Sequence, residues 1–177
     1  MRSNFNPKNI VLIGFMGTGK TSVGKALAPK LGLRVVDVDT HIESQEKNKI
    51  SAIFSEKGEA YFRALEKNAV QELSRETGLV ITTGGGVVLN PANLEALRER
   101  SVVIALLASP ETIYERVKGS KHRPLLQKGE VRSEIDRLYQ ERASLYSQAD
   151  LKFDTDGQTP AQVANKIFEA LKEGSYF

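Results

Sequence analysis

The sequence predicts an α/β protein with three layers, α/β/α, built around a five-stranded parallel sheet. Two observations lead to this prediction. Five apolar segments with strand character alternate with segments of helical character along the 177 residues. Three of the helical segments open with a capping side chain followed by proline, at Asn90-Pro91, Ser109-Pro110 and Thr159-Pro160. Strands that alternate with helices form parallel sheets, and helices cover both faces of such sheets.

The first strand is expected within residues 9–15, and it leads into the glycine-rich segment 14–21, which reads GFMGTGKT. This segment matches G-x-x-x-x-G-K-[ST] at all four fixed positions. In such a loop, backbone N–H groups converge on an anion at the start of a helix. A glycine-rich turn that matches by chance is the alternative, but the preceding strand and the following helix supply the context that the pattern requires. The sequence therefore predicts a fold of the P-loop NTPase type.

The other strands are expected within residues 33–39, 79–86, 101–108 and 151–155. The first three strands along the chain end in the phosphate loop, in two aspartates and in three glycines. Ligands bind beyond the carboxyl ends of parallel strands, so these residues are expected to meet at one site. The three glycines either let a ligand approach the backbone closely or form a plain tight turn.

Two stretches interrupt the alternation, and the whole chain 1–177 is interpreted as one domain that contains them. Residues 40–78 are expected to form several helices instead of one crossover helix, and extra length of this kind is usually functional. Residues 118–129 are rich in Lys, Gly and Arg, and we expect them to form a lid.

Composition excludes several classes of protein. The chain has no cysteine, so disulfides, thiolate catalysis and cysteine-bound metal are absent. The net charge of +3 comes without a long basic block, which does not favour a nucleic-acid partner. No apolar run is long enough to span a membrane and no secretory signal is recognised, so a cytoplasmic protein is expected. His41 and His122 lack the spacing of metal ligands.

Four residues near the phosphate loop are candidates for chemistry. Lys20 is expected to bridge the outer two phosphates, and the Thr21 hydroxyl is a hard oxygen ligand for Mg²⁺. Asp37 and Asp39 are expected on the same side of a strand. One carboxylate then lies near the metal, and the other accepts a hydrogen bond from a substrate hydroxyl. The alternative for Asp39 is a helix cap, since the residues after it match a capping pattern.

Arg142 interrupts the apolar stripe of a helix expected over residues 131–146, which also carries Ile135, Leu138 and Leu145. A guanidinium that faces the interior requires an anionic partner. The alternative is that the long side chain reaches the edge of the protein.

Two further arginines stay ambiguous on the residues alone. Arg63 and Glu66 lie three positions apart on a helix, which by itself predicts an ordinary surface ion pair. Arg123 precedes a proline in the expected lid. It either stabilises charge on a transferring phosphoryl group or belongs to a solvated basic loop.

Several motifs together resemble the shikimate kinase family. They occur in chain order from residue 9 to the last helix: GFMGTGKT, DVD at 37–39, FR at 62–63, TGGG at 83–86, RPLL at 123–126 and ERASLY at 141–146. The resemblance implies transfer of the γ-phosphate of ATP to the 3-hydroxyl of shikimate, which gives shikimate 3-phosphate and ADP in aromatic amino acid biosynthesis. Another small-metabolite kinase on the same scaffold is the alternative, and an ATP-sensing domain without transfer is a second one.

The resemblance also implies a set of site residues. The expected catalytic residues are Lys20, Asp39 and Arg123. The expected nucleotide-binding residues are Gly17, Thr18, Gly19, Lys20, Thr21, Ser22, Arg116, Arg123 and Pro160. The expected shikimate-binding residues are Asp39, Arg63, Gly84, Gly85, Gly86, Arg142, Phe54 and Phe62, with Glu66 as support for Arg63. The expected ligands of Mg²⁺ are Thr21 and Asp37.

The resemblance assigns residues 40–78 to a helical substrate-binding region. The expected partners of the protein are shikimate and MgATP. No nucleic acid and no membrane are expected as partners, and the protein is expected to be a monomer. One departure concerns residues 47–54, KNKISAIF, where the family often has a glycine turn. This departure affects the expected local turn and leaves the chemistry unchanged.

Overall fold

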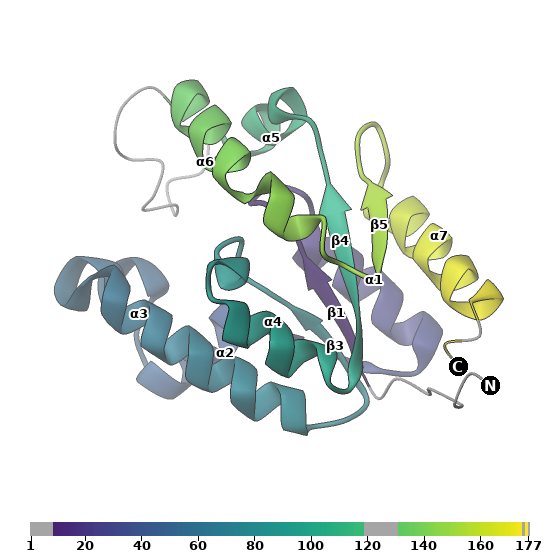
Figure 1. Ribbon diagram of the computed structural model, residues 1–177, viewed down its shortest axis with the longest axis horizontal. Coiled ribbons are helices and arrows are strands. Elements are labelled where there is room, and N and C mark those ends of the chain that lie inside the picture. Colours follow the sequence, from purple (N-terminus) through teal and green to yellow (C-terminus); the bar gives the residue numbers. More distant parts are fainter. Residues whose placement is uncertain (1–8, 119–130, 175, 177) are drawn as a thin grey trace.

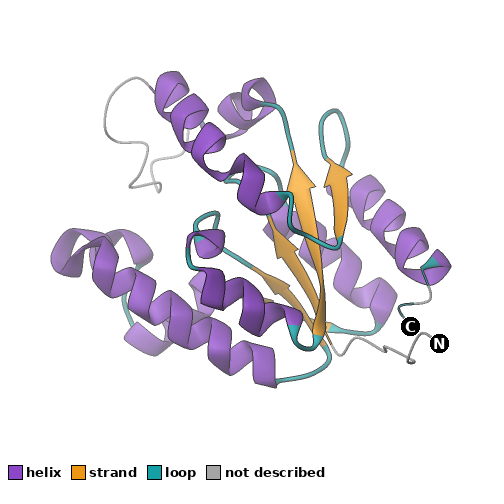
Figure 2. Cartoon of the chain, viewed as in Figure 1, coloured by secondary structure: helices purple, strands orange, loops and turns teal. Residues whose placement is uncertain are grey.

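The computed structural model describes residues 9–118, 131–174 and 176, so Arg123 and almost all of the expected lid lie outside the described residues. The described chain forms a five-stranded sheet with the order β2-β3-β1-β4-β5, and every neighbouring pair is parallel. The strands are β1 (Asn9–Ile13), β2 (Arg34–Asp37), β3 (Leu79–Thr82), β4 (Ser101–Leu107) and β5 (Leu151–Asp154). The predicted five-stranded parallel sheet is confirmed (Figure 2).

Helices cover both faces of the sheet (Figure 1). They are α1 (Lys20–Leu31), α2 (Val38–Glu46), α3 (Ile50–Arg75), the 3₁₀ turn η1 (Val87–Leu89), α4 (Pro91–Arg98), α5 (Pro110–Val117), α6 (Val131–Tyr146) and α7 (Pro160–Glu173). Ile10 and Leu12 of β1 pack with α1 and α7, whereas Val11 and Ile13 pack in the core on the opposite face with α2 to α6. Since successive side chains of a strand point to opposite faces, β1 is apolar on both.

The three predicted helix starts are confirmed. Helices α4, α5 and α7 each begin at the predicted proline. The side chains of Asn90, Ser109 and Thr159 accept hydrogen bonds from backbone N–H groups of the first turns. Each cap satisfies a donor that the helix itself leaves without a partner.

The second strand is shorter than the sequence predicts, and this changes the position of Asp39. Strand β2 ends at Asp37, whose Oδ1 accepts the N–H of Thr40 at 3.1 Å and thereby starts α2. Asp39 lies in the first turn of this helix. The prediction that both aspartates share one face of a strand is wrong, and so is the alternative that Asp39 is the cap. The Asp37 side chain accepts a hydrogen bond from the backbone three residues later, and this bond stabilises the start of a helix at the expense of a longer strand.

Two helices, α2 and α3, occupy most of residues 40–78. The turn between them includes Lys47 at φ 52°, the one non-glycine residue with positive φ in the described chain. The turn for which the family often has a glycine thus contains a lysine here, and this lysine adopts the left-handed backbone conformation that glycine favours. Helix α3 is kinked at Gly58, where φ is 81° and ψ is 172°.

Helix α1 packs closely against the sheet at Gly24. A Cβ atom at this position would lie 2.5 Å from Cγ2 of Thr82 in β3, which is closer than real contacts allow. The absence of a side chain at Gly24 therefore sets how near α1, and with it the phosphate loop, lies to the end of β3.

Candidate active site

The phosphate loop connects β1 to α1 and has the backbone geometry that its glycines permit. Gly17 and Gly19 have φ values of 78° and 92°, which side chains disfavour. At Gly14 a Cβ atom would lie 2.4 Å from the carbonyl oxygen of Leu106. The ammonium group of Lys20 donates to the carbonyl oxygens of Gly14 and Phe15 at 2.8 and 2.9 Å. The ammonium group of Lys20 thus lies against the backbone of the loop, at the N-terminus of α1.

A cavity of about 330 Å³ lies at the carboxyl ends of β1, β2 and β3. It brings together residues from the phosphate loop, from the start of α2 and from the glycine loop, which we define as residues 84–86. The lining residues are Met16, Gly17, Gly19, Lys20, Thr21, Ser22, Asp37, Asp39, Thr83, Gly84 and Gly85. The meeting of three strand ends at one edge agrees with the sequence prediction.

Asp37 and Thr21 lie side by side in this cavity. Oδ2 of Asp37 accepts the hydroxyl of Thr21 at 2.9 Å and the hydroxyl of Thr82 at 2.6 Å. Carboxylate and hydroxyl oxygens are the ligands that Mg²⁺ prefers. The donor set therefore fits Mg²⁺, and Thr82, which the sequence analysis did not identify, holds the orientation of the carboxylate.

Asp39 faces the cavity with a buried oxygen. Its Oδ1 accepts no hydrogen bond from any residue that the structure describes. Burial, with the negative charges of Asp37 and Glu66, raises the pKa of Asp39 to about 6, against the opposing effect of Lys20 and Arg63. A carboxylate with this pKa is ionised at neutral pH and is still basic enough to accept a proton.

Each residue of the glycine loop is approached closely by a different part of the site. A Cβ atom at Gly84 would lie 3.1 Å from Oδ1 of Asp39, and one at Gly85 would lie 3.2 Å from the backbone nitrogen of Met16. At Gly86 it would lie 2.5 Å from Nη2 of Arg63. Little space is therefore left for a side chain at any of the three positions, and Gly86 lies directly against the guanidinium of Arg63.

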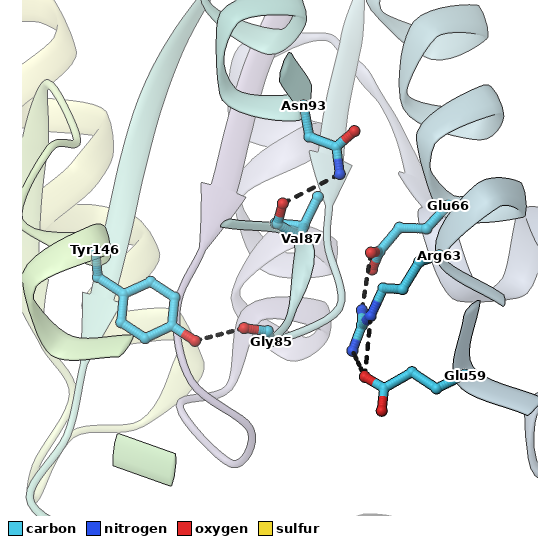
Figure 3. Close-up of polar contacts among 7 residues, drawn as sticks. All are labelled: Glu59, Arg63, Glu66, Gly85, Val87, Asn93 and Tyr146. Carbon is cyan, nitrogen blue, oxygen red and sulfur yellow. Dashed lines mark hydrogen bonds and ion pairs between the residues drawn. The ribbon is translucent and has the colours of Figure 1, made fainter. Parts of the chain in front are cut away.

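Arg63 is held between two carboxylates of its own helix, α3 (Figure 3). Its Nη1 donates to Glu66 at 2.8 Å, and its Nε and Nη2 donate to Oε1 of Glu59 at 3.3 and 3.0 Å. The interpretation as an ordinary surface pair is wrong for Glu66, because its side chain is only 1% exposed. Burial raises the pKa of Glu66, although the charges of Arg63 and Arg142 oppose this effect.

Arg142 lies in the interior, in contrast to the alternative that it reaches the edge. It is 4% exposed, and its Cζ lies 5.9 Å from the centre of the Phe15 ring. Its Nε has no hydrogen-bond partner among the described residues. It makes no ion pair within the described residues. The buried stripe of α6 continues from Arg142 to Tyr146, whereas Leu145 is only partly buried.

A second cavity, of about 230 Å³, lies on the other side of the phosphate loop. Its lining includes Thr18, Ser22, Arg116 and Pro160. Arg116 donates to the carbonyl oxygens of Gly17 and Thr155 at 3.0 and 2.9 Å, which fixes its guanidinium beside the loop. The structure therefore brings these predicted nucleotide-binding residues together.

Other predicted acceptor residues lie beyond the lining of the first cavity. Arg63 and Gly86 lie against each other, and the rings of Phe54 and Phe62 on α3 are in contact, with centres 4.8 Å apart and planes tilted by 38°. The sequence analysis missed Met16 and Thr83 in the cavity, and Glu59 and Tyr146 around it. A spacing of four residues between Glu59 and Arg63 is a signal that could have identified Glu59.

Within the described ranges, no helix is both long and apolar enough to cross a bilayer.

Comparison with known proteins gives consistent matches over most of the chain. A family model described as Shikimate kinase matches residues 16–172. The shikimate kinase of Persephonella marina is 46% identical over 165 residues, which cover 93% of this chain and 99% of the relative. That of Thermodesulfovibrio yellowstonii is 48% identical over 170 residues, or 94% and 98% of the two chains. A solved structure of shikimate kinase from Acinetobacter baumannii in complex with shikimate superposes with a TM-score of 0.92, at 34% identity over 96% of each chain.

Proposed function

The chain belongs to the shikimate kinase family, and on that premise we propose how its residues divide the work of the reaction. The enzyme is an ATP-dependent kinase that phosphorylates the 3-hydroxyl of shikimate, a step of aromatic amino acid biosynthesis. In-line phosphoryl transfer needs little covalent chemistry from the protein. The roles of its residues are therefore to position the two substrates and to stabilise the charge of the phosphoryl group.

The acceptor end rests on one observation. Oδ1 of Asp39, Oε1 of Glu66 and Nε of Arg142 are buried polar atoms without a hydrogen-bond partner among the described residues. Buried polar atoms usually have a partner, and a ligand with hydroxyl and carboxylate groups would supply one to Asp39 and to Arg142. We assign Arg142 and Arg63 to the carboxylate of shikimate, because a guanidinium matches a carboxylate with two parallel bonds. Asp39 takes the ring hydroxyls.

Asp39 acts on the hydroxyl that is phosphorylated. Its oxygen lies next to Gly84 at the acceptor side of the cavity that Lys20 and Thr21 also line. Its pKa of about 6 supports a role as proton acceptor near neutral pH. Gly84 lies beside it, and we assign Gly84, Gly85 and Gly86 to contacts with the same ring. Phe54 and Phe62 form an apolar wall on α3.

The nucleotide end consists of Gly17, Thr18, Gly19, Lys20, Thr21 and Ser22 around the phosphates, with Arg116 and Pro160 beside the base. Lys20 leaves its backbone carbonyl partners for the outer phosphates when ATP binds. Thr21 and Asp37 would hold Mg²⁺, which shields the negative charge of the phosphates when it is bound. The adjacent hydroxyl and carboxylate oxygens support this assignment.

The remaining assignments rest on the sequence. We propose that Arg123 stabilises the transferring phosphoryl group and that residues 40–78 form the acceptor-binding region of a single kinase domain. The monomeric state and the cytoplasmic location stay predictions.

The pH dependence of turnover tests the role of Asp39. We expect kcat to rise with pH through about 6 and to level off above 7, because the ionised carboxylate is the active form. Asp39→Asn should lower kcat by about 10²-fold or more while the KM for MgATP changes little. Asp136→Asn on the exposed face of α6 is the matched control and should behave as wild type. A variant Asp39→Asn with near-normal turnover would remove Asp39 from the catalytic residues.

A further inference from the structure

Tyr146 ends helix α6 with a buried hydroxyl. The residue is 1% exposed, and its hydroxyl donates to the carbonyl oxygen of Gly85 at 2.5 Å (Figure 3). Burial raises the pKa of this phenol well above its ordinary value, although Arg142 opposes the rise through its charge and a side-chain hydrogen bond. Tyr146 therefore stays a neutral hydrogen-bond donor in the enzyme.

The bond to Gly85 determines the direction of the next N–H group. A trans peptide is planar, so its carbonyl oxygen and the following N–H point in opposite directions. Holding the Gly85 oxygen towards Tyr146 therefore turns the N–H of Gly86 away from Tyr146. In the view of Figure 3, Arg63 and Glu66 lie on that far side of Gly85. Within the described chain, the N–H groups of Gly85 and Gly86 donate to no backbone carbonyl, and Gly85 lines the first cavity.

The same bond joins two parts of the acceptor site that are distant in sequence. Gly85 follows β3, whereas Tyr146 is 61 positions further along the chain. Arg142 precedes Tyr146 by four residues, which is about one helical turn, so both side chains project from the same face of α6. A change in the position of α6 relative to the glycine loop would break the bond and would also move the guanidinium of Arg142.

We propose that Tyr146 is a positioning residue that fixes the glycine loop relative to Arg142, so that backbone N–H groups and guanidinium meet the same acceptor molecule. This inference rests on the proposed assignment of Arg142 and the glycine loop to shikimate. The ring alone fills the space, and phenylalanine would do the same. The hydroxyl is the part that carries the positioning, since a buried hydroxyl is unfavourable unless it is hydrogen-bonded.

The test removes one hydroxyl from α6 at a time. Tyr146→Phe deletes the bond to Gly85 and the hydrogen bond between Tyr146 and Arg142, so it removes the hydroxyl's contacts to both parts of the acceptor site. Tyr139→Phe is the matched control, because Tyr139 lies on the same helix and packs edge-on against Phe15, but its hydroxyl makes no hydrogen bond to a described residue. For Tyr146→Phe we expect a KM for shikimate raised about 3- to 10-fold, with the KM for MgATP within about twofold of wild type. Tyr139→Phe should leave both KM values unchanged.

A second measurement observes the loop directly. In protein labelled with ¹⁵N-glycine, the amide resonances of Gly85 and Gly86 should shift in Tyr146→Phe and stay in place in Tyr139→Phe. An unchanged KM for shikimate in Tyr146→Phe, or an equal rise for both substrates, would overturn the proposal. A Tyr146→Phe protein that does not fold would also overturn it, because the hydroxyl would then be needed for stability and not for positioning.

Arg142→Met separates this inference from the assignment on which it rests. If Arg142→Met leaves the response to shikimate unchanged, the assigned acceptor site is wrong. If Arg142→Met impairs shikimate use and Tyr146→Phe does not, the acceptor site stands and only the positioning role fails.

Discussion

Two arginines with the same assigned ligand lie in opposite environments. Arg63 is 23% exposed and its guanidinium is already bonded to Glu59 and Glu66. Arg142 is 4% exposed, has an Nε without a partner and makes no ion pair within the described residues. The protein thus compensates one of the two charges before the ligand arrives and leaves the other largely to the ligand.

This difference separates stability from binding. A buried charge without a partner is unfavourable, and a bound carboxylate relieves this at Arg142. At Arg63 the same carboxylate must share or replace an existing acidic partner. We therefore expect substitutions of Arg142 to affect ligand use most, and substitutions of Arg63 to affect folding as well.

The largest effect is expected for Arg142→Met. Loss of a buried charged partner typically costs about 2–5 kcal/mol of binding, so kcat/KM for shikimate should fall about 30- to 5,000-fold. The KM for MgATP should stay near wild type. The free energy of unfolding should be unchanged or slightly higher, because the substitution removes a buried charge that makes no ion pair within the described residues. Steady-state kinetics and urea unfolding measure these effects, and a large loss of stability would contradict the comparison.

A smaller effect, on folding, is expected for Arg63→Met. It leaves the buried carboxylate of Glu66 without its partner, which should lower the free energy of unfolding by about 3 kcal/mol at pH 7.5. Burial raises the pKa of Glu66, so the folded state binds a proton more readily than the unfolded state does. The stability of the variant should therefore recover as the pH falls from 7.5 towards 5. Urea unfolding at both pH values measures this.

The double variant Arg63→Met with Glu66→Gln is the control for that prediction. Glutamine has no charge to bury, so most of the lost stability should return. If the double variant is as unstable as the single one, the loss comes from packing around α3 and not from the ion pair.

The smallest effect is expected for Glu59→Gln. Glu59 occupies Nε and Nη2 of Arg63 but is 50% exposed, and exposed pairs of this spacing contribute about 0.3–0.5 kcal/mol. Removing this competitor should tighten shikimate binding about twofold, as measured by titration calorimetry at low salt. Weaker binding would mean that Glu59 orients Arg63 for the ligand and does not compete with it.

The sequence predicts most of the fold because its local signals are strong. Asn90, Ser109 and Thr159 each precede a proline, and all three do start helices. The extent of β2 could not be predicted in the same way. An aspartate at a strand end can continue the strand or cap a helix. Residue type and spacing do not distinguish Asp37 from Asp39 as the cap, and the bond from the N–H of Thr40 to Asp37 does so in the structure.

The candidate site likewise has a part that the sequence predicts and a part that it does not. The phosphate loop could be predicted because its chemistry is contiguous in sequence. The partners of distant residues could not: Thr82 orients Asp37 from 45 positions away, and Tyr146 holds Gly85 from 61. The burial of Glu66 likewise cannot be predicted from its spacing on the helix, because it depends on which elements pack against α3.

The missing side chain at Gly24 has a consequence for engineering the enzyme. Replacing a helical glycine by alanine is a standard route to a more heat-resistant protein, and it usually gains about 0.5–1 kcal/mol. Here the added methyl group would collide with Thr82, whose hydroxyl orients Asp37. A thermostabilisation library for this scaffold should therefore leave Gly24 unchanged, because the added methyl group would displace the Thr82 side chain that orients Asp37.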